Sequence, residues 1–330
     1  TQSSQDNGLV NFSKIPAGVY DIDATISIGA SEYTNATGDP KENDIVFNGS
    51  LKNQTISETQ TSFQVSLVAG KIGDFVIKQV YYAGSDRTDG ATYRDQFIEI
   101  YNNSNEVLYA DSLYIMQAYG SNTVSPDFSR GYYQENRQLD WTKSLNIPSE
   151  IKDKGNSDYL YTRSLLRIPG TGKTYPVQPG ESIVLAQTAI NHKQPFQGND
   201  GKSIAVRNPA LTVDLSKADF EAYYAPLITR PLASDIDNPN VPNLDVIIFY
   251  GTDWLLDNPG RDAFVIFKTD KDIGSFPKVA SPQSSTITSS TNLYIQIPKS
   301  LVIDGVESAE ALPAERVAKK LQNDVDAGFS

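Results

Sequence analysis

Short apolar runs separated by polar turns recur along the chain and predict a mainly β protein. Residues 95–116, DQFIEIYNNSNEVLYADSLYIM, contain two such runs on either side of a polar turn. In the first run Ile98 and Ile100 share one face of a strand, and Glu99 lies on the other face between two aromatic residues. Because both faces carry apolar groups, we expect this strand to lie inside a sheet rather than at its edge.

The same pattern predicts strands in seven segments, which are residues 75–84, 96–103, 106–119, 181–190, 244–250, 263–268 and 293–298. Pro-, Asn- and Asp-rich stretches between them are typical of loops. Helix signals are few. A capping box at Ser216–Asp219 predicts a short helix through Leu227, and residues 314–322 (AERVAKKLQ) after Pro313 predict two further turns.

Residues 1–70 form a separate block by composition. The turn Pro16-Ala17-Gly18 joins two predicted strands, a polar loop follows at 31–44, and short strands are expected at 45–47 and 63–67. We expect a small β-sandwich here, a linker at 69–73, and a larger β domain over 74–330. The expected fold is therefore tandem β-sandwiches with long loops.

Charge and composition exclude several classes of function. The formal net charge of −12 argues against nucleic acid and anionic membrane surfaces as partners. The chain has no cysteine, which removes disulfides, thiol nucleophiles and thiolate metal sites. No apolar run is long enough to span a membrane. The abrupt opening TQSSQDNG is interpreted as a processed start.

Two motifs suggest chemistry that their surroundings do not support. Gly170-Thr171-Gly172-Lys173-Thr174 matches the end of a phosphate-binding loop, but Arg167 stands where the full pattern needs glycine, and a turn and strand follow instead of a helix. His192 is the only histidine, so a multi-histidine metal site is excluded and no Gly-x-Ser-x-Gly elbow accompanies it. We expect a hairpin loop and a structural or surface histidine.

Oxygen-rich loops leave two interpretations open. Asp235, Asp237 and Asp245 with neighbouring asparagines supply ligands that suit Ca²⁺, although the spacing is not that of an EF-hand. Solvated turns explain the same residues, and a weaker set follows at Asp253, Asp257 and Asp262. Among 40 acids a pair at glycosidase separation is also conceivable, but the sequence selects none. No catalytic residue is assigned, and no cofactor is expected apart from the calcium alternative.

Aromatic residues in loops are the remaining candidates for binding. Tyr132, Tyr133 and Trp141 lie in a Tyr- and Ser-rich stretch at residues 120–165, and Trp254 lies in a later turn. Such residues stack on sugars or anchor a protein partner, or else they cover a core. The long stretch without strong periodicity is where we expect binding.

The N-terminal block resembles the carboxypeptidase-regulatory-like domains of bacterial surface proteins. The matching residues are Asp6-Asn7-Gly8, Phe12, Ile15-Pro16, Gly18 and Tyr20. In that family these residues close a hairpin within a β-sandwich. The strand that precedes these residues in the family is missing here. The resemblance therefore implies that the N-terminus of this chain is trimmed.

The stretch FIEIYNNSNEVLYADSLYI resembles the lamin-tail type of immunoglobulin-like domain. The resemblance implies structural roles for Glu99 and Asn102, which hold a strand and its turn in that family; a catalytic acid is the alternative for Glu99. Residues 74–330 also resemble uncharacterised Bacteroidota surface proteins. The shared segments are FVIKQVYYAG, IVLAQTAINH, DLSKADFEAYY, D-x-DNPxVPNLD, IDGVE and DAGF. That family's domain continues past DAGF, so we expect this chain to stop early.

These resemblances imply an exported protein on the extracellular face of the outer membrane, held by a lipid anchor upstream of this chain. Asp111-Ser112-Leu113 then matches the short O-glycosylation acceptor of Bacteroidota, which makes Ser112 a candidate modification site. We expect a binding or accessory lipoprotein in nutrient capture, with a TonB-dependent type of transporter or a glycan as partner. A structural adhesin or stalk and a glycan hydrolase with paired carboxylates are the alternatives.

Overall fold

The computed structural model describes residues 2–4, 8–38, 45–59, 61–69, 74–84, 88–91, 93–104, 106–257, 259–322 and 324–326. The chain divides into two compact units, Thr1–Gly70 and Lys71–Ser330. The predicted linker at 69–73 spans this division, and its residues 70–73 lie outside the described residues. Asp6, Asn7 and most of the DAGF segment also lie outside them.

The first unit contains one antiparallel sheet in the order β1 (Gly18–Ile28), β2 (Ile45–Ile56) and β3 (Val68–Ala69). The Tyr20 hydroxyl donates to the Pro16 carbonyl at 2.9 Å and closes the predicted turn. A helix, α1 (Ala30–Thr37), replaces part of the expected polar loop. It ends at Gly38, whose left-handed φ of 75° lets its N–H donate to Thr34.

Two strands expected in this unit do not form. Residues 8–13 and 61–67 have no strand, and the side chains of Leu9 and Phe12 are exposed. The apolar pattern of residues 8–13 predicted a strand, but a strand also needs a partner to pair with, and none of the described residues supplies one.

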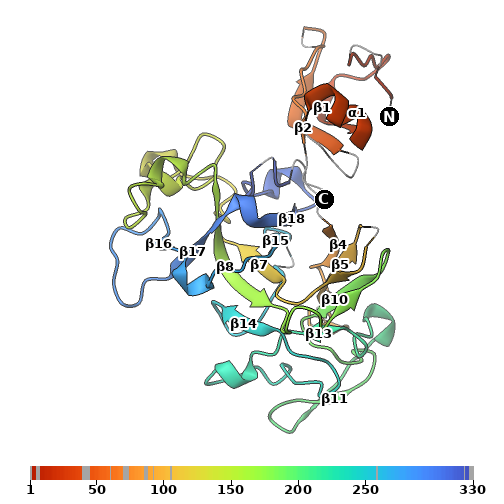
Figure 1. Ribbon diagram of the computed structural model, residues 1–330, viewed down its shortest axis with the longest axis vertical. Coiled ribbons are helices and arrows are strands. Elements are labelled where there is room, and N and C mark those ends of the chain that lie inside the picture. Colours follow the sequence, from red (N-terminus) through yellow and green to blue (C-terminus); the bar gives the residue numbers. More distant parts are fainter. Residues whose placement is uncertain are drawn as a thin grey trace. The chain divides into compact units, whose positions relative to one another are not determined.

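The second unit contains two principal sheets (Figure 1). The smaller has four strands in the order β13 (Phe220–Glu221), β10 (Ser182–Ala186), β5 (Phe97–Asn102) and β4 (Phe75–Tyr81). The strand β5 is internal, as predicted, since it pairs antiparallel with both β4 and β10.

The larger sheet runs β16 (Lys278–Ala280), β17 (Leu293–Pro298), β8 (Tyr159–Arg167), β7 (Tyr114–Ala118), β15 (Ala263–Phe267) and β18 (Val302–Glu307), and β14 (Asp245–Ile248) also pairs with β8. Two small ladders pair β6 (Leu108–Tyr109) with β9 (Pro176–Val177), and β11 (Phe196–Gln197) with β12 (Ser203–Ile204). The predicted mainly β class is confirmed.

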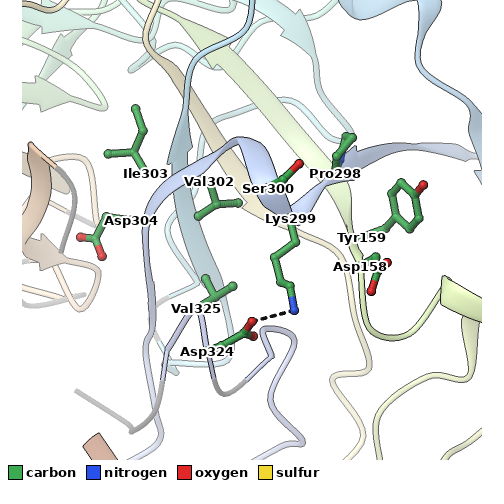
Figure 2. A pocket seen from close by; sticks show the side chains of 10 residues that line it. All are labelled: Asp158, Tyr159, Pro298, Lys299, Ser300, Val302, Ile303, Asp304, Asp324 and Val325. Carbon is green, nitrogen blue, oxygen red and sulfur yellow. Dashed lines mark ion pairs between the residues drawn. The ribbon is translucent and has the colours of Figure 1, made fainter. Parts of the chain in front are cut away.

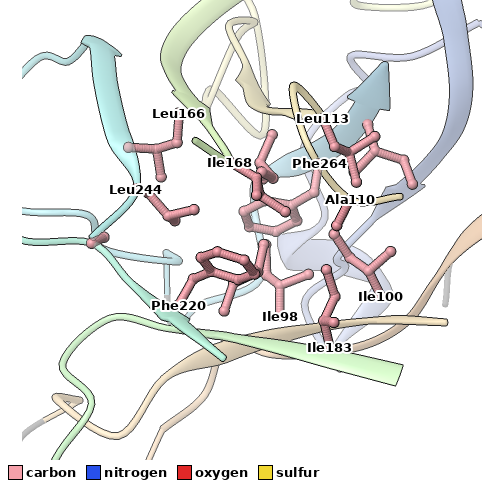
Figure 3. Packing of buried hydrophobic residues seen from close by; sticks show 14 of the residues in the cluster. Ile98, Ile100, Ala110, Leu113, Leu166, Ile168, Ile183, Phe220, Leu244 and Phe264 are labelled. Carbon is pink, nitrogen blue, oxygen red and sulfur yellow. The ribbon is translucent and has the colours of Figure 1, made fainter. Parts of the chain in front are cut away.

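Apolar side chains from both sheets meet in the main core (Figure 3). Ile98 and Ile100 of β5 and Ile183 of β10 face Leu166 and Phe264 of the larger sheet. All but Ile183 are fully buried. Because the β5 side chains that enter this core alternate along the strand, the pattern read from the sequence matches the buried face of the strand.

The opposite face of the larger sheet is buried as well. Met116, Leu165 and Val265 pack there, and Leu321 of the C-terminal segment covers them. A third cluster joins β16 and β17 to the segment between β7 and β8, drawn in yellow-green beside them in Figure 1. Seven strands of this unit coincide with predicted segments, namely β4, β5, β7, β10, β14, β15 and β17.

The helices predicted in the second unit are wrong. Residues 216–227 form the short strand β13 and a 3-10 turn, and residues 313–322 contain only one 3-10 turn. Backbone pairing of Phe220–Glu221 with β10 takes precedence over the capping signal there. The 3-10 turns in the described residues are 128–130, 141–143, 152–154, 209–211, 225–227, 273–275, 299–301 and 313–315.

Among the strands of four or more residues in the second unit, the pattern missed β8 and β18. The sequence of β8, YLYTRSLLR, is buried on both faces and shows no alternation of apolar and polar residues. The predicted loop of residues 120–165 therefore ends at residue 158, and β8 begins at Tyr159. No helix in the described part of the chain is long and apolar enough to cross a membrane.

Candidate functional site

A polar cavity of about 430 Å³ opens where the start of the 119–158 segment, residues 119–123, meets the larger sheet. It collects residues from seven separate stretches of the second unit. The lining residues are Ala118, Tyr119, Gly120, Ser121, Asn122, Thr123, Arg163, Tyr250, Asp262, Gln283, Asn292, Tyr294 and Lys320. We call this cavity the tyrosine pocket.

Three tyrosines form one wall of the tyrosine pocket. Tyr119 follows β7 and stacks on Tyr294 of β17, with ring centroids 3.7 Å apart and an interplanar angle of 18°. Tyr250, which follows β14, meets Tyr294 edge to face at 5.6 Å and donates its hydroxyl to the Leu293 carbonyl at 2.6 Å. Burial raises the pKa of Tyr250 and of Tyr294, which keeps both phenols neutral.

Arg163 reaches the tyrosine pocket from an irregularity in β8. Gln117 of β7 pairs with Ser164, and Ala118 pairs with Thr162, so Arg163 is the extra residue of a β-bulge. A bulge redirects a side chain that regular pairing would send elsewhere. The Arg163 side chain is 39% exposed, which leaves its guanidinium accessible from the cavity.

Asp262 holds this arginine. It directly precedes β15 and is 1% exposed, and its carboxylate accepts from Arg163 Nη1 at 3.2 Å and from Gln117 Nε2 at 2.7 Å. Burial raises the pKa of Asp262, while Arg163 and Lys320 oppose that rise. Asp262 and Arg163 both line the cavity. The Asp262 carboxylate holds the Arg163 guanidinium in position and is itself shielded from solvent.

The C-terminal segment supplies Lys320. Its ammonium donates to the Arg261 carbonyl, and its backbone N–H donates to the buried carboxylate of Glu307. Burial raises the pKa of Glu307 to about 7 and lowers that of Lys320. Gly120 leaves room for the lysine stem, because a Cβ there would lie 2.5 Å from Lys320 Cγ.

Amide side chains occupy the exposed rim of the tyrosine pocket. Asn122, Gln283 and Asn292 are exposed. Gln283 Nε2 donates to the Tyr133 hydroxyl at 3.2 Å, which places one of the predicted contact residues beside the rim. Tyr132 is half-buried and packs on Tyr133 at 4.9 Å.

This arrangement suits recognition of a small polar ligand. Aromatic faces, amides and a guanidinium are the groups that bind hydroxyl-rich molecules such as saccharides. Asp262 is the one carboxylate among the lining residues, and it is already bonded to Arg163 and Gln117. The pair of opposed carboxylates that glycoside hydrolysis uses is therefore not present in this pocket.

Both tryptophans proposed as surface contacts are buried, so that prediction is wrong. The Trp141 ring is 6% exposed and stacks on Tyr161, with centroids 3.3 Å apart. Trp254 is 1% exposed and lies in the main core. The alternative considered for them, aromatic residues that cover a core, describes both.

Glu99 and Asn102 make contacts that support strand β5 and the turn that follows it. Glu99 pairs with Lys78 across β4 and β5 at 2.6 Å, on the face opposite the core. Asn102 is buried, and its amide donates to the carbonyls of Glu106 and Val177 at 2.8 Å. It ties the turn after β5 to the neighbouring β9.

The loop that imitates a phosphate-binding motif encloses Asp111 instead. The backbone N–H groups of Gly172, Thr174 and Tyr175 donate to its carboxylate at 2.8–2.9 Å. These bonds outweigh burial and lower the pKa of Asp111 to about 2. The donors that a phosphate would need are therefore occupied by the protein's own side chain.

The O-glycosylation candidate Ser112 follows directly in the same turn. It is half-buried, has a left-handed φ of 58°, and its N–H donates to Ile168 at 3.0 Å. It does not lie within a strand.

His192 is buried, which rules out the surface role. Its Nε2 lies 2.9 Å from the Thr188 carbonyl, and burial lowers its pKa.

The acidic sets do not converge. Asp245 pairs with Arg167 at 2.6 Å, Asp237 accepts from Asn243, and the buried Asp235 accepts the N–H of Tyr224. The weaker set is likewise divided among arginines: Asp253 pairs with Arg94, Asp257 with Arg261 and Asp262 with Arg163. In the described part of the chain no three acidic or histidine side chains form a group that could hold a metal ion.

A second cavity of about 270 Å³ lies between the start of β8 and the turn from β17 to β18 (Figure 2). Lys299 pairs with Asp324 at 2.7 Å in this cavity. Asp304 accepts from the Ile77 N–H, and burial raises its pKa to about 6. Asp158 accepts from Ser157. Each of these three carboxylates therefore has a partner within the protein.

The fold and the tyrosine pocket define a mainly β protein with a polar candidate ligand site in its larger unit. Residues 178–330 match the family model described as "Protein of unknown function (DUF4876)". The fold is similar to the crystal structure of a DUF4876 family protein from Bacteroides thetaiotaomicron VPI-5482, at 24% identity and a TM-score of 0.55, covering 100% of this chain and 75% of that chain. No curated protein matches the chain significantly.

Sequence reasoning missed most of the residues in the tyrosine pocket. Tyr119, Tyr250 and Tyr294 are three of 18 tyrosines and lie far apart in the sequence. Arg163 is brought to the pocket by a bulge, which leaves no pattern in the sequence. Five of the lining residues, Gly120, Ser121, Asn122, Thr123 and Arg163, fall in the stretch of residues 120–165 where binding was predicted.

Proposed function

We propose that this protein is a binding or accessory lipoprotein on the surface of a bacterial outer membrane and that its tyrosine pocket captures a saccharide. The observation that carries the proposal is the pocket itself, which combines aromatic rings, exposed amides and a bonded arginine in about 430 Å³. A cavity of this size accommodates one or a few sugar rings.

Location and partner rest on the resemblance of residues 74–330 to Bacteroidota surface proteins. A lipid anchor upstream of this chain would hold the protein on the extracellular face. A transporter of the TonB-dependent type would receive the captured ligand. A purely structural stalk is the rival, and it has no need for a polar cavity beside a bulge that directs an arginine into it.

We propose further that binding is not accompanied by turnover. The lining of the tyrosine pocket contains a single carboxylate, Asp262, whose oxygens are bonded. Incubation of the purified protein with a polysaccharide panel tests this directly. The hydrolase alternative would be established instead if the protein released product continuously and if replacing one acidic residue by its amide abolished that release.

The accessory role is tested in the native host. Detergent extraction with an affinity tag should co-purify an outer-membrane transporter in fixed ratio, and external protease should cleave the protein on intact cells. Disruption of the gene should reduce uptake of the bound glycan. A lone monomer that binds no glycan and whose loss leaves uptake unchanged would contradict the proposal.

A further inference from the structure

We propose that the ligand of the tyrosine pocket is an acidic saccharide, one whose carboxylate pairs with Arg163. This inference rests on the proposed binding function and specifies the chemical class of the ligand. It depends on the charged residues that line the pocket, on the unused hydrogen-bond donors of the Arg163 guanidinium and on the polar side chains of the rim.

The lining of the pocket contains two cationic side chains and one anionic side chain. Arg163 and Lys320 are the cations among its lining residues and Asp262 is the anion, in a chain whose formal net charge is −12. Lys320 is directed to the Arg261 carbonyl and to buried acids. Arg163, whose side chain is 39% exposed, is therefore the cation that remains open to an anionic ligand.

Arg163 has unused hydrogen-bonding capacity. A guanidinium carries five N–H donors, and within the described residues the Arg163 side chain donates one bond, from Nη1 to Asp262 at 3.2 Å. Asp262 is fixed in turn by Gln117, whose Oε1 accepts from Ser164. This chain of contacts orients the guanidinium while leaving most of its donors free, the arrangement that bidentate carboxylate recognition requires.

The rest of the pocket matches the uncharged part of such a ligand. Tyr119 and Tyr250 are half-buried beside Tyr294 and offer ring surface to a sugar. Asn122 and Asn292 on the rim supply donors and acceptors for hydroxyl groups. Ring faces that stack on sugars, together with rim amides that pair with hydroxyl groups, make a saccharide the class that we propose, and an acidic peptide is an outcome of the test.

The test is isothermal titration calorimetry of the full chain against matched pairs of probes: oligogalacturonate and neutral galacto-oligosaccharide, and sialyllactose and lactose. The acidic member of at least one pair should bind, with an affinity that falls as ionic strength rises. The neutral partner should bind about 10- to 100-fold more weakly, as expected for loss of a charged hydrogen-bonded pair.

Variants locate the interaction. Arg163→Met should reduce the affinity for the acidic probe by about 10- to 100-fold and leave that for the neutral probe unchanged, whereas Arg163→Lys should retain part of the difference. Arg207→Met, at an exposed arginine that pairs with Asp89, is the matched control and should change neither affinity. The melting temperature of each variant verifies folding.

The outcomes separate the two proposals. If acidic and neutral probes bind equally and Arg163→Met has no effect, the acidic class is wrong while the saccharide site survives. A tetra-aspartate peptide, titrated in the same way, is the further probe; if it binds as tightly as the acidic saccharides, the saccharide class is wrong. If no saccharide binds while the protein is folded, both proposals fail.

Discussion

The substitution Asp111→Asn tests whether the 170–174 loop is a structural brace. In the native protein three backbone N–H groups donate to this carboxylate, two to Oδ1 and one to Oδ2. An asparagine oxygen can keep the two bonds at one position, but its amide would then face the N–H of Tyr175, donor against donor. The substitution should therefore remove one bond and introduce a repulsive contact.

The size of the effect follows from the pKa. The network lowers the pKa of Asp111 from 3.8 to about 2, and one pKa unit corresponds to about 1.4 kcal/mol, so the charged form gains about 2.5 kcal/mol. Because the folded pKa is depressed, this stability is present above pH about 4 and is lost as the pH falls through about 2. Asp111→Asn should lower the free energy of unfolding by about 2–3 kcal/mol at pH 7, and by less as the pH falls below 4.

Urea unfolding followed by tryptophan fluorescence measures this, because Trp141 and Trp254 are both buried in the second unit. Asp200→Asn is the matched control: its carboxylate accepts a single backbone N–H, from Lys202, in an exposed turn. We expect a change below about 0.5 kcal/mol there. An Asp111→Asn protein as stable as the wild type at pH 7 would refute the role assigned to the loop.

Three further predictions concern stability. Burial, together with nearby acids, raises the pKa of Glu221 from 4.5 to about 7. The folded protein therefore binds more protons at Glu221 than the unfolded chain does, and wild-type stability should fall as the pH rises from 4.5 to 7. In Glu221→Gln the melting temperature should depend less on pH over this range. An unchanged pH dependence would mean that Glu221 does not cause the loss of stability. Trp141→Ala should cost about 3–5 kcal/mol in urea unfolding, against less than about 0.5 kcal/mol for the exposed Phe128→Ala in the same segment. Glu99→Gln should cost less than about 1 kcal/mol, since its partner Lys78 is 52% exposed, and a larger loss would mean a deeper role for this acid.

Alternating patterns in the sequence predicted the strands that have one face in a core. The strand β5 is the clear case, with Ile98 and Ile100 inward and Glu99 outward. The pattern could not predict β8, because both faces of that strand are buried and the alternation disappears. It also could not distinguish the capping signal at Ser216 from a turn that leads into β13, since the deciding contact is a strand distant in sequence.

The candidate site was less predictable than the fold, for a geometric reason. Its residues come from a bulge in β8, a turn after β14 and the C-terminal segment, among other places. No local sequence motif indicates that these segments meet. Aromatic residues in loops indicated the region of the chain that lines the pocket, but they did not identify the individual residues that line it. Trp141 supports the core, and the less conspicuous Tyr119, Tyr250 and Tyr294 line the cavity.

Hydrogen–deuterium exchange with and without the best-binding saccharide tests the central claim, that the tyrosine pocket is the ligand site. The bound protein should exchange more slowly at residues 118–123 and 292–294, which line the pocket, and should be unchanged at 298–304, which line the second cavity. Protection confined to residues 298–304, or saturating ligand that protects neither segment, would contradict the account.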